Sequence, residues 1–255
     1  MNVSMIGMSV LKFLSEIERV AANFQGKGWG SDTTLKEVRA IKKILGRDKV
    51  RLAVDIGGNQ GDYSKIVLKN FLDTKLFIFE PDNMSFKKLK ERFKGNSQVF
   101  IENLAVSNHT GEVPFYTNQA GSTLGSLYNR RVSHLNIAFK ETQKAKCIKF
   151  EKFWSEKLQE KTVDLCKIDI EGHELEALQG FGNALQHIKT IQFEFGKCNI
   201  DSRTYFQDFW YFFKENGFEI HRITAFGPKK IYRYNELDEF FLTTNYIAKN
   251  VHSIV

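Results

Sequence analysis

The sequence predicts an α/β protein with a doubly wound, mostly parallel sheet. Segments with strand and helix periodicity alternate along most of the chain, which is typical of helices that connect parallel strands. The clearest unit covers residues 52–68, where an apolar strand, a glycine-containing turn and an amphipathic helix follow one another. The last two predicted strands, 218–223 and 240–247, have no helix between them, so we expect an antiparallel edge.

Two helices are expected before this unit. Apolar residues from Val10 to Phe24 are spaced by four and three residues in turn, which predicts an amphipathic helix that ends at the glycine-rich segment 26–30. Thr34 and Glu37 have the spacing of a capping box, and the second helix stops at Gly46. We expect residues 1–50 to form an N-terminal helical arm or lid, and residues 51–250 to form the α/β domain.

The remaining elements alternate between the two types. Strand-like segments are continuous apolar runs, and helix-like segments carry apolar residues every three to four positions. The predicted strands are 76–79, 99–104, 113–117, 147–150, 163–170 and 190–195, and the predicted helices are 85–93, 174–180 and 205–216. Residues 111–161 contain only short strand-like pieces between polar stretches, so we interpret them as an insertion.

Composition narrows the class of protein. The 255-residue chain has a net charge of +7, but its lysines are scattered, which makes nucleic acid an unfavourable partner. The three cysteines have neither metal-site nor disulfide-framework spacing and suit a reducing compartment. No segment approaches about 18 uninterrupted apolar residues, and the first residues lack the basic start of a signal peptide. We therefore expect a cytoplasmic protein that does not enter the membrane.

The turn after the first strand indicates the type of ligand. Its candidate cofactor-binding residues are Asp55, Gly57, Gly58, Asn59 and Gly61. A dinucleotide fingerprint has a glycine where this chain has Asn59, and the strand-end carboxylate of Asp55 would repel a pyrophosphate. A carboxylate in that position suits a cationic ligand instead, such as the ammonium and sulfonium of S-adenosylmethionine.

The next two strand ends extend the predicted cofactor site. Glu80 lies 19 residues after Gly61, close to the spacing at which an acid binds ribose hydroxyls in these folds. Asn103 and Ala105 follow the third strand and face the same crevice. We expect the backbone there to hold adenine, with Asn103 as a side-chain donor.

The segment 167–174 is the second informative cluster. It places Lys167, Asp169, Glu171 and His173 at the end of an apolar strand, where ligands bind in open sheets. A strand interior seldom buries charged groups without a functional reason, so a base, a metal ligand or an ammonium partner is expected here. Asp169, Glu171 and His173, together with Glu194 at the end of the next strand, could surround a hard divalent ion, although we assign no metal.

These motifs, in this order, resemble the FkbM family of S-adenosylmethionine-dependent methyltransferases. The matching segments are 54–61, 79–81, 103–107 and 167–174, and the similarity extends over about residues 52–247. The resemblance implies a seven-stranded Rossmann-like methyltransferase sheet and methyl transfer to a hydroxyl, often on a sugar or a polyketide-like product. Family members often carry a Leu-Asp-Asp-type acid before the lysine-containing strand, where this chain has Phe-Glu-Lys at 150–152.

The leading hypothesis is an O-methyltransferase that acts on a hydroxyl of a glycan or a glycosylated product. The chain lacks the Asn/Asp-Pro-Pro-Tyr/Phe motif of enzymes that methylate amino groups of nucleic acids, which favours oxygen as the acceptor atom. An alcohol must lose its proton as the new bond forms. Glu171 or His173 is the expected catalytic base, and Asp169 is expected to orient the acceptor or the cofactor ammonium.

The insertion at 111–161 is the expected acceptor-recognition element, because loops on a fixed scaffold carry specificity. We expect contacts to a polyol from Ser122, Thr123, Ser126 and Asn129, and to a phosphate or uronate from Arg130 and Arg131. The alternative is that residues 111–161 form a surface segment that does not contact the substrate.

Three other classes of protein remain open from the sequence. They are a methyltransferase that acts on RNA or on another small molecule, an NAD(P)-dependent oxidoreductase, and a non-catalytic nucleotide- or RNA-binding module. Asn59 and Asp55 disfavour the oxidoreductase. The sequence does not determine the oligomeric state.

Overall fold

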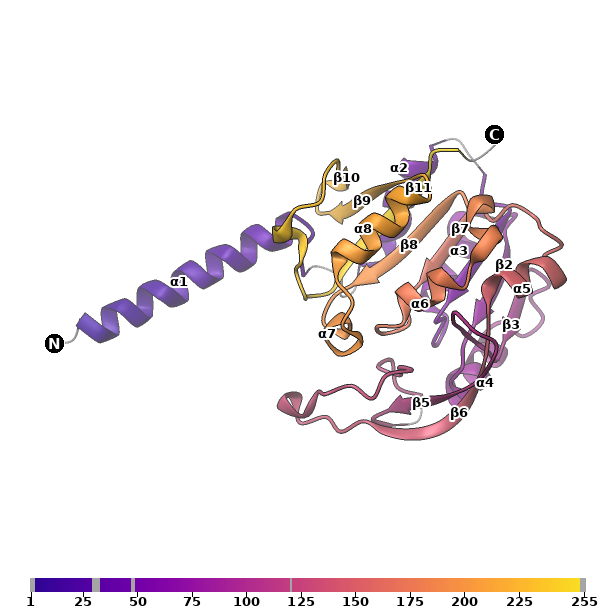
Figure 1. Ribbon diagram of the computed structural model, residues 1–255, viewed down its shortest axis with the longest axis horizontal. Helices are drawn as coiled ribbons and strands as arrows, with labels where there is room; N and C mark the ends of the chain where they lie inside the picture. Colours follow the sequence, from indigo (N-terminus) through magenta and orange to yellow (C-terminus); the bar gives the residue numbers. More distant parts are fainter. Residues whose placement is uncertain (1–2, 29–32, 47–48, 120, 253–255) are drawn as a thin grey trace.

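A computed structural model of the protein describes residues 3–28, 33–46, 49–119 and 121–252. Its main feature is an eight-stranded sheet with the order β10-β9-β11-β8-β7-β1-β2-β3 (Figure 1). The strands are β1 (Leu52–Ile56), β2 (Lys75–Phe79), β3 (Val99–Glu102), β7 (Leu165–Ile168), β8 (Thr190–Phe195), β9 (Phe218–Thr224), β10 (Gly227–Lys230) and β11 (Thr244–Asn250).

The directions of the strands confirm a mostly parallel sheet with an antiparallel edge. The strands β3, β2, β1, β7 and β8 are parallel neighbours. β11 is antiparallel to both β8 and β9, between which it lies, and β10 pairs with β9 at the edge as an antiparallel hairpin. The hairpin raises the strand number from the expected seven to eight. The sequence of β10, Gly-Pro-Lys-Lys, has no alternation of apolar and polar residues, as is usual for an edge strand.

The last strand lies further along the chain than expected, at Thr244–Asn250 instead of 240–247. The apolar residues before it are not part of the sheet. Phe241 packs beside Phe195 with ring centroids 5.3 Å apart, and the short 3₁₀ helix η3 (Glu236–Asp238) precedes Phe241. An apolar run alone does not distinguish a strand from a loop that covers the core.

Helices cover both faces of the sheet, as the prediction of a doubly wound fold requires. One face packs against α2 (Thr34–Leu45), α3 (Asp62–Asn70) and α4 (Asn83–Arg92). The other packs against α5 (Phe150–Glu156), α6 (Glu174–Gln179), η2 (Gly182–His187) and α8 (Phe206–Glu215). Stacked aromatic rings fill this second face: Phe193 lies 5.2 Å from Phe209 and 5.4 Å from Tyr246 between ring centroids.

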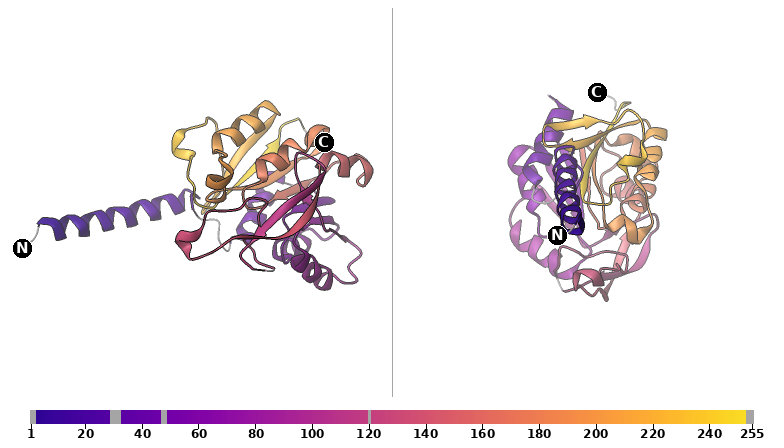
Figure 2. Two further views of the ribbon diagram at one scale, coloured as in Figure 1. Left: turned by 60° about the horizontal axis from the view of Figure 1, so that its bottom comes forward. Right: turned by 90° about the vertical axis from the view of Figure 1, so that its left-hand side faces the viewer.

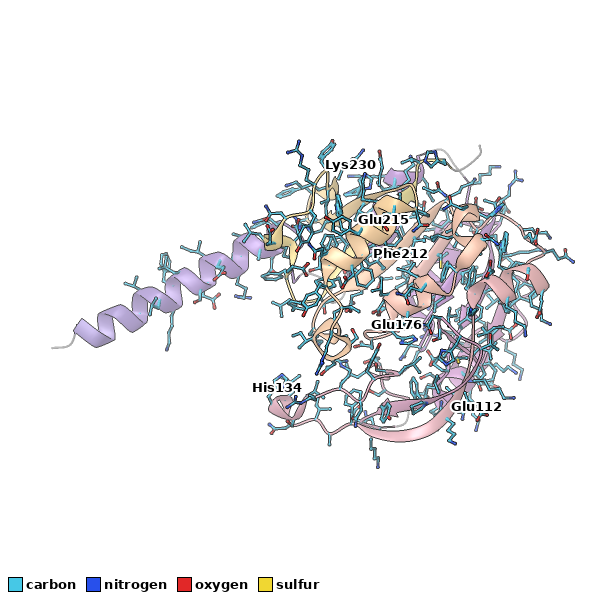
Figure 3. All side chains as sticks on the ribbon, in the orientation of Figure 1. Glu112, His134, Glu176, Phe212, Glu215 and Lys230 are labelled. Atoms are coloured by element: carbon cyan, nitrogen blue, oxygen red, sulfur yellow. The ribbon has the colours of Figure 1, made fainter. Side chains whose placement is uncertain are left out.

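The two N-terminal helices differ in their surroundings. α1 (Val3–Phe24) projects away from the rest of the molecule (Figures 1 and 2), and its residues 9–21 are exposed to solvent (Figure 3). Its end is anchored, because Phe24 stacks on Phe226 and the Arg222 guanidinium donates to the Gln25 carbonyl over 2.8 Å. α2 instead belongs to the core, where Ile41 is fully buried. The expected N-terminal unit 1–50 therefore consists of a projecting helix and a helix packed on the sheet.

The insertion at 111–161 builds a second, three-stranded sheet. Its order is β4-β6-β5, with β4 (Ala105–Val106), β5 (Gly111–Thr117) and β6 (Lys140–Ile148). β6 is longer than the strand expected at 147–150, and Phe150 already begins α5. The short helix η1 (Ser133–Leu135) lies near α7 (Cys198–Ser202), because the Arg131 amide just before η1 donates to Asp201 Oδ1 on α7 over 3.0 Å.

None of the helices in the described part of the chain combines the length and the apolar character needed to cross a membrane.

The place of α2 can be tested with two truncations on the same helix. Ile41→Ala should lower the free energy of unfolding by about 2–5 kcal/mol, because it opens a cavity in the core. Leu35→Ala, at a position 55% exposed, should change it by no more than about 0.5 kcal/mol. Urea unfolding measures both, and equal, small effects would show that α2 is not part of the cooperative unit.

Candidate active site

The turn after β1 fits closely between two neighbouring strand ends. The amides of Gly57 and Gly58 both donate to the Phe79 carbonyl, over 2.9 and 3.0 Å. Gly57 has a φ of +88°, and a Cβ there would lie 1.9 Å from the Asp169 carbonyl oxygen. A side chain is therefore excluded by both conformation and space, and the backbone of this turn remains open to a ligand.

A cavity of about 300 Å³ lies at the carboxyl ends of β1, β2, β7 and β8, where open α/β sheets bind ligands. It brings together residues from segments far apart in the sequence. Six of the nine expected cofactor residues line it: Gly57, Gly58, Asn59, Glu80, Ala105 and Asp169. Asp55, Gly61 and Asn103 do not. Gly61, with a φ of +82°, begins α3 and packs against the Phe93 ring.

Glu80 is held in place at the edge of the cavity by two backbone amides. Its Oε2 accepts from the Asn59 amide over 2.7 Å, and its Oε1 accepts from the Asp82 amide over 2.8 Å. Burial raises the pKa of this carboxyl group to about 7, against the opposing effect of these two hydrogen bonds. Each carboxylate oxygen still has a lone pair for a further donor.

The expected role of the Asn103 side chain is not supported. Its amide nitrogen donates to the carbonyls of Glu80 (2.9 Å) and Pro81 (3.2 Å), so it fixes the end of β2 and does not face the cavity. Leu104 and Ala105 line the cavity in its place. The sequence located the correct strand end but not the direction of the side chain.

Asp55 does not contact the cavity either, which corrects the expectation of a direct ligand contact. It is fully buried beneath the turn, and its Oδ2 accepts from the Ser64 hydroxyl over 2.6 Å. Its Oδ1 has no hydrogen-bond partner among the residues described. Burial raises the pKa of Asp55, and the neighbouring Lys167 lowers it. Its charge therefore acts on Lys167, its register partner on β7.

Lys167 and Asp169 form an ion pair at the floor of the cavity. The ammonium donates to Asp169 Oδ2 over 2.8 Å and lies 4.8 Å from the centroid of the Tyr63 ring. Burial lowers the pKa of Lys167, but the carboxylates of Asp169, Asp55 and Glu37 together raise it above its ordinary value. The lysine is therefore a permanent cation and not a base.

Glu171 lines the cavity, but one of its oxygens is already engaged. Oε2 accepts from Arg130 Nη1 over 2.6 Å and from the Cys198 thiol over 2.7 Å. Burial raises the pKa of Glu171, and the Arg130 guanidinium lowers it. Its φ of +56° places it in a tight turn.

His173 does not line the cavity, so the structure gives no support to the expectation that it acts as a base there. The chain turns through Gly172, with a φ of +108°, and directs the imidazole toward Ser107, whose hydroxyl lies 2.9 Å from Nε2. Glu174 stabilises this turn, because its carboxylate accepts from the amides of Ile170 and Gly172. Burial lowers the pKa of His173.

Residues 122–131, here called the strap, cross the mouth of the cavity. Ser126 donates to the Glu171 carbonyl over 2.8 Å, the Asn59 side chain donates to the Ser122 carbonyl over 3.1 Å, and Tyr128 donates to Glu176 on α6. The strap is therefore tied to both the glycine turn and the 170–176 segment.

The expected acceptor contacts of the strap are only partly placed at the cavity. Ser122, Thr123 and Ser126 line it, whereas Asn129 does not. Arg130 is buried and paired with Glu171 and, at 3.6 Å, with Asp201, so it is not available to a phosphate or uronate. Arg131 is exposed on the surface outside the lining.

Glu194 completes the lining at the end of β8. No described residue donates a hydrogen bond to its carboxylate. Burial, together with the charges of Asp169, Glu171 and Glu174, raises the pKa of Glu194 well above its ordinary range. The described residues contain no group of three or more histidine, cysteine, aspartate or glutamate side chains arranged to hold a metal ion.

Two lining residues, Thr34 and Tyr63, were not anticipated from the sequence. Thr34 begins α2, far from the motifs, and nothing in the sequence indicates that α2 reaches the cavity. Tyr63 follows the glycine turn by two residues, so the expected helical geometry could have placed its ring on the face toward the sheet.

The fold is that of an α/β protein with a cavity at its strand ends, the place where open α/β sheets bind ligands. A family model described as "Methyltransferase FkbM domain" matches residues 55–220, and the chain belongs to this family. The resemblance drawn from the motifs is thereby confirmed. The protein is a methyltransferase, and S-adenosylmethionine is its methyl donor.

Several solved methyltransferase structures are similar to this chain at low sequence identity. The plantazolicin methyltransferase BpumL in complex with SAH has a TM-score of 0.49 and 10% identity, over 94% of this chain and 89% of that one. The METTL16 MTase domain has a TM-score of 0.48 and 11% identity, over 85% and 67%. A precorrin-6y C5,15-methyltransferase from Geobacter metallireducens has a TM-score of 0.43 and 11% identity, over 84% and 88%. No curated protein matches the sequence.

The cavity suits this cofactor chemically. S-adenosylmethionine carries a ribose diol, which needs acceptors, and two cationic groups, which need negative charge. Glu80 supplies carboxylate oxygens that could accept from the diol, and Asp169 supplies a carboxylate that could face a cationic group. The glycine turn between them lets a ligand approach the backbone.

Proposed function

We propose that the protein transfers the methyl group of S-adenosylmethionine to a hydroxyl of a sugar, a glycan or a glycosylated product. The observation that carries the proposal is the polar lining of the cavity beside the strap. Ser122 and Thr123 offer hydroxyls there, and Glu194 offers a carboxylate that can accept from an alcohol. Lys167 is the only basic side chain in the described lining, and Asp169 neutralises it. This lining favours a neutral polyol over a polyanion.

In this proposal Glu80 accepts hydrogen bonds from the ribose hydroxyls, and the turn at Gly57 and Gly58 borders the methionine part. Asn59 holds the Glu80 carboxylate in its orientation through its backbone amide. Leu104 and Ala105 lie against the adenine. Asp169 faces the ammonium of the methionine part, where its pairing with Lys167 fixes its position.

The chemistry needs an acceptor for the proton of the alcohol. The cofactor supplies an electrophilic methyl group and leaves as S-adenosylhomocysteine. As the acceptor oxygen forms its bond to the methyl carbon, the hydroxyl proton must pass to a nearby base. Glu194 suits this role better than Glu171, because no described residue donates a hydrogen bond to its carboxylate, whereas Arg130 and Cys198 both donate to Glu171 Oε2. Glu171 is then proposed to orient the acceptor, while Asp169 faces the cofactor ammonium.

The acceptor class is tested by incubating the protein with methyl-labelled S-adenosylmethionine and panels of nucleotide sugars, oligosaccharides, RNA and small phenols. Label should appear in an oxygen-linked methyl group of a carbohydrate. Label in RNA or on nitrogen, with none in carbohydrate, would show that the proposed acceptor is wrong while leaving the methyltransferase assignment intact.

The base is tested with the acceptor that accumulates label in that panel. Glu194→Gln should lower kcat by about 100-fold or more, in the range of general-base catalysis, and should change the affinity for S-adenosylhomocysteine less than twofold. Glu171→Gln should lower kcat less. Wild-type turnover in Glu194→Gln would show that a residue other than Glu194 is the base.

The ribose contact predicts a pH dependence of cofactor affinity. Ribose hydroxyls donate to the ionised form of Glu80, whose pKa of about 7 is raised by burial. Binding should therefore weaken as the pH falls below 7, by about tenfold per pH unit once the group is protonated. Calorimetry should show affinity for S-adenosylhomocysteine rising from pH 6 to pH 8 in the wild type.

Glu80→Gln provides the control for this prediction, because it keeps the shape of the side chain and removes the titrating group. Its affinity should be lower at pH 8 and nearly independent of pH. The same pH dependence in Glu80→Gln as in the wild type would assign the titration to another group and contradict the ribose contact.

A further inference from the structure

A row of buried polar side chains crosses the sheet directly beneath the active site. Asp55 on β1 lies opposite Lys167 on β7, which lies opposite Gln192 on β8. Their strand neighbours, such as Val54 and Cys166, pack in the core on the other face. Because side chains alternate along a strand, the polar row faces α2 and α3.

The ammonium of Lys167 is the element of this row that most needs support. A buried cation is stable only if charges and polar groups surround it. Asp169 supplies one partner at 2.8 Å, and the face of the Tyr63 ring, at 4.8 Å from Nζ, supplies another. The position of the ring therefore helps to set the position of the Lys167–Asp169 pair, and all three side chains line the cavity.

The Tyr63 ring is in turn fixed by a chain of two hydrogen bonds that ends on α2. Its hydroxyl donates to Gln192 Oε1 over 2.8 Å, and Gln192 Nε2 donates to Glu37 Oε2 over 2.6 Å. The carboxylate of Glu37 also accepts from the Thr33 hydroxyl over 2.7 Å and from the Asn245 side chain over 3.4 Å.

The hydrogen bonds to Glu37 and Tyr63 fix which way the Gln192 amide points. Its nitrogen donates to the Glu37 carboxylate on α2, and its carbonyl oxygen accepts from the Tyr63 hydroxyl. If the amide turned over, its carbonyl oxygen would lie against the carboxylate oxygen that now accepts from it, and its nitrogen would lie against the Tyr63 hydroxyl, so both hydrogen bonds would be lost in a buried site. Glu37 therefore acts on Tyr63 without touching it.

We propose that Glu37 is a positioning residue of the cofactor site, which holds the Lys167–Asp169 pair in place through Gln192 and Tyr63. It lies outside residues 55–220, which match the family model, and so belongs to a part of the chain that the family assignment does not cover. The inference rests on the proposed function in one respect, that Asp169 faces the methionine part of the cofactor.

The test is a double-mutant cycle read by calorimetric titration with S-adenosylhomocysteine. Glu37→Gln replaces a carboxylate that accepts three hydrogen bonds with an amide that has a single acceptor oxygen. Tyr63→Phe keeps the ring but removes the hydroxyl that donates to Gln192. Each should weaken binding by about fivefold, a typical size for coupling within one buried network. The double variant should be no weaker than the weaker single variant, because both cut the same chain.

Val38→Ala is the matched control, because this buried apolar residue is the sequence neighbour of Glu37 on α2. It should lower the stability measured by urea unfolding but leave the affinity within twofold. If Glu37→Gln does not fold, Gln192→Met cuts the same chain from β8 and takes its place in the cycle.

Wild-type affinity in folded Glu37→Gln, or effects that add in the double variant, would overturn the inference. So would an equal loss of affinity in Val38→Ala, which would make the effect one of general stability. Glu80→Gln, titrated alongside, separates the two proposals: reduced affinity there, with wild-type affinity in Glu37→Gln, rejects only the positioning role. Wild-type affinity in Glu80→Gln rejects the proposed ribose contact.

Discussion

The burial of the Lys167 ammonium is the constraint on which much of the active site depends. A cation within a sheet requires nearby carboxylates, and this protein supplies them from three elements: Asp169 on its own strand end, Asp55 on β1 and Glu37 on α2. The same charged groups make the floor of the cavity polar. Because the lysine is neutralised in place, it fixes a carboxylate at the strand end and does not present a free positive charge to the ligand.

This constraint also connects the N-terminal part of the chain to the site. The helices α2 and α3 cover the polar row of Asp55, Lys167 and Gln192. The packing of α2 on the sheet therefore contributes to both the stability of the domain and the geometry of the cavity. α1, in contrast, leaves the domain at Phe24 (Figure 1). The two helices look alike in the sequence, since both are amphipathic, and only their neighbours in space separate them.

The sequence predicted the features that depend on local chemistry and on strand order. The turn at Gly57 and the acid at Glu80 could be identified because their roles follow from spacing along one strand–turn–helix unit. Side-chain direction after a tight turn could not be predicted, and the positive φ of Gly172 directs His173 away from the cavity. Arg130 was expected to bind substrate because an exposed loop was assumed, whereas the fold buries it against Glu171. The contact between Glu37 and Gln192, 155 residues apart, has no local signal.

The most direct test of the account is a crystal structure of the protein with S-adenosylhomocysteine bound. The account predicts the ribose hydroxyls within hydrogen-bond distance of Glu80, the methionine part beside Gly57, and an intact Lys167–Asp169 pair next to it with the Tyr63 ring against the ammonium. A ligand bound away from the strand ends, or a methionine part that separates Lys167 from Asp169, would contradict it.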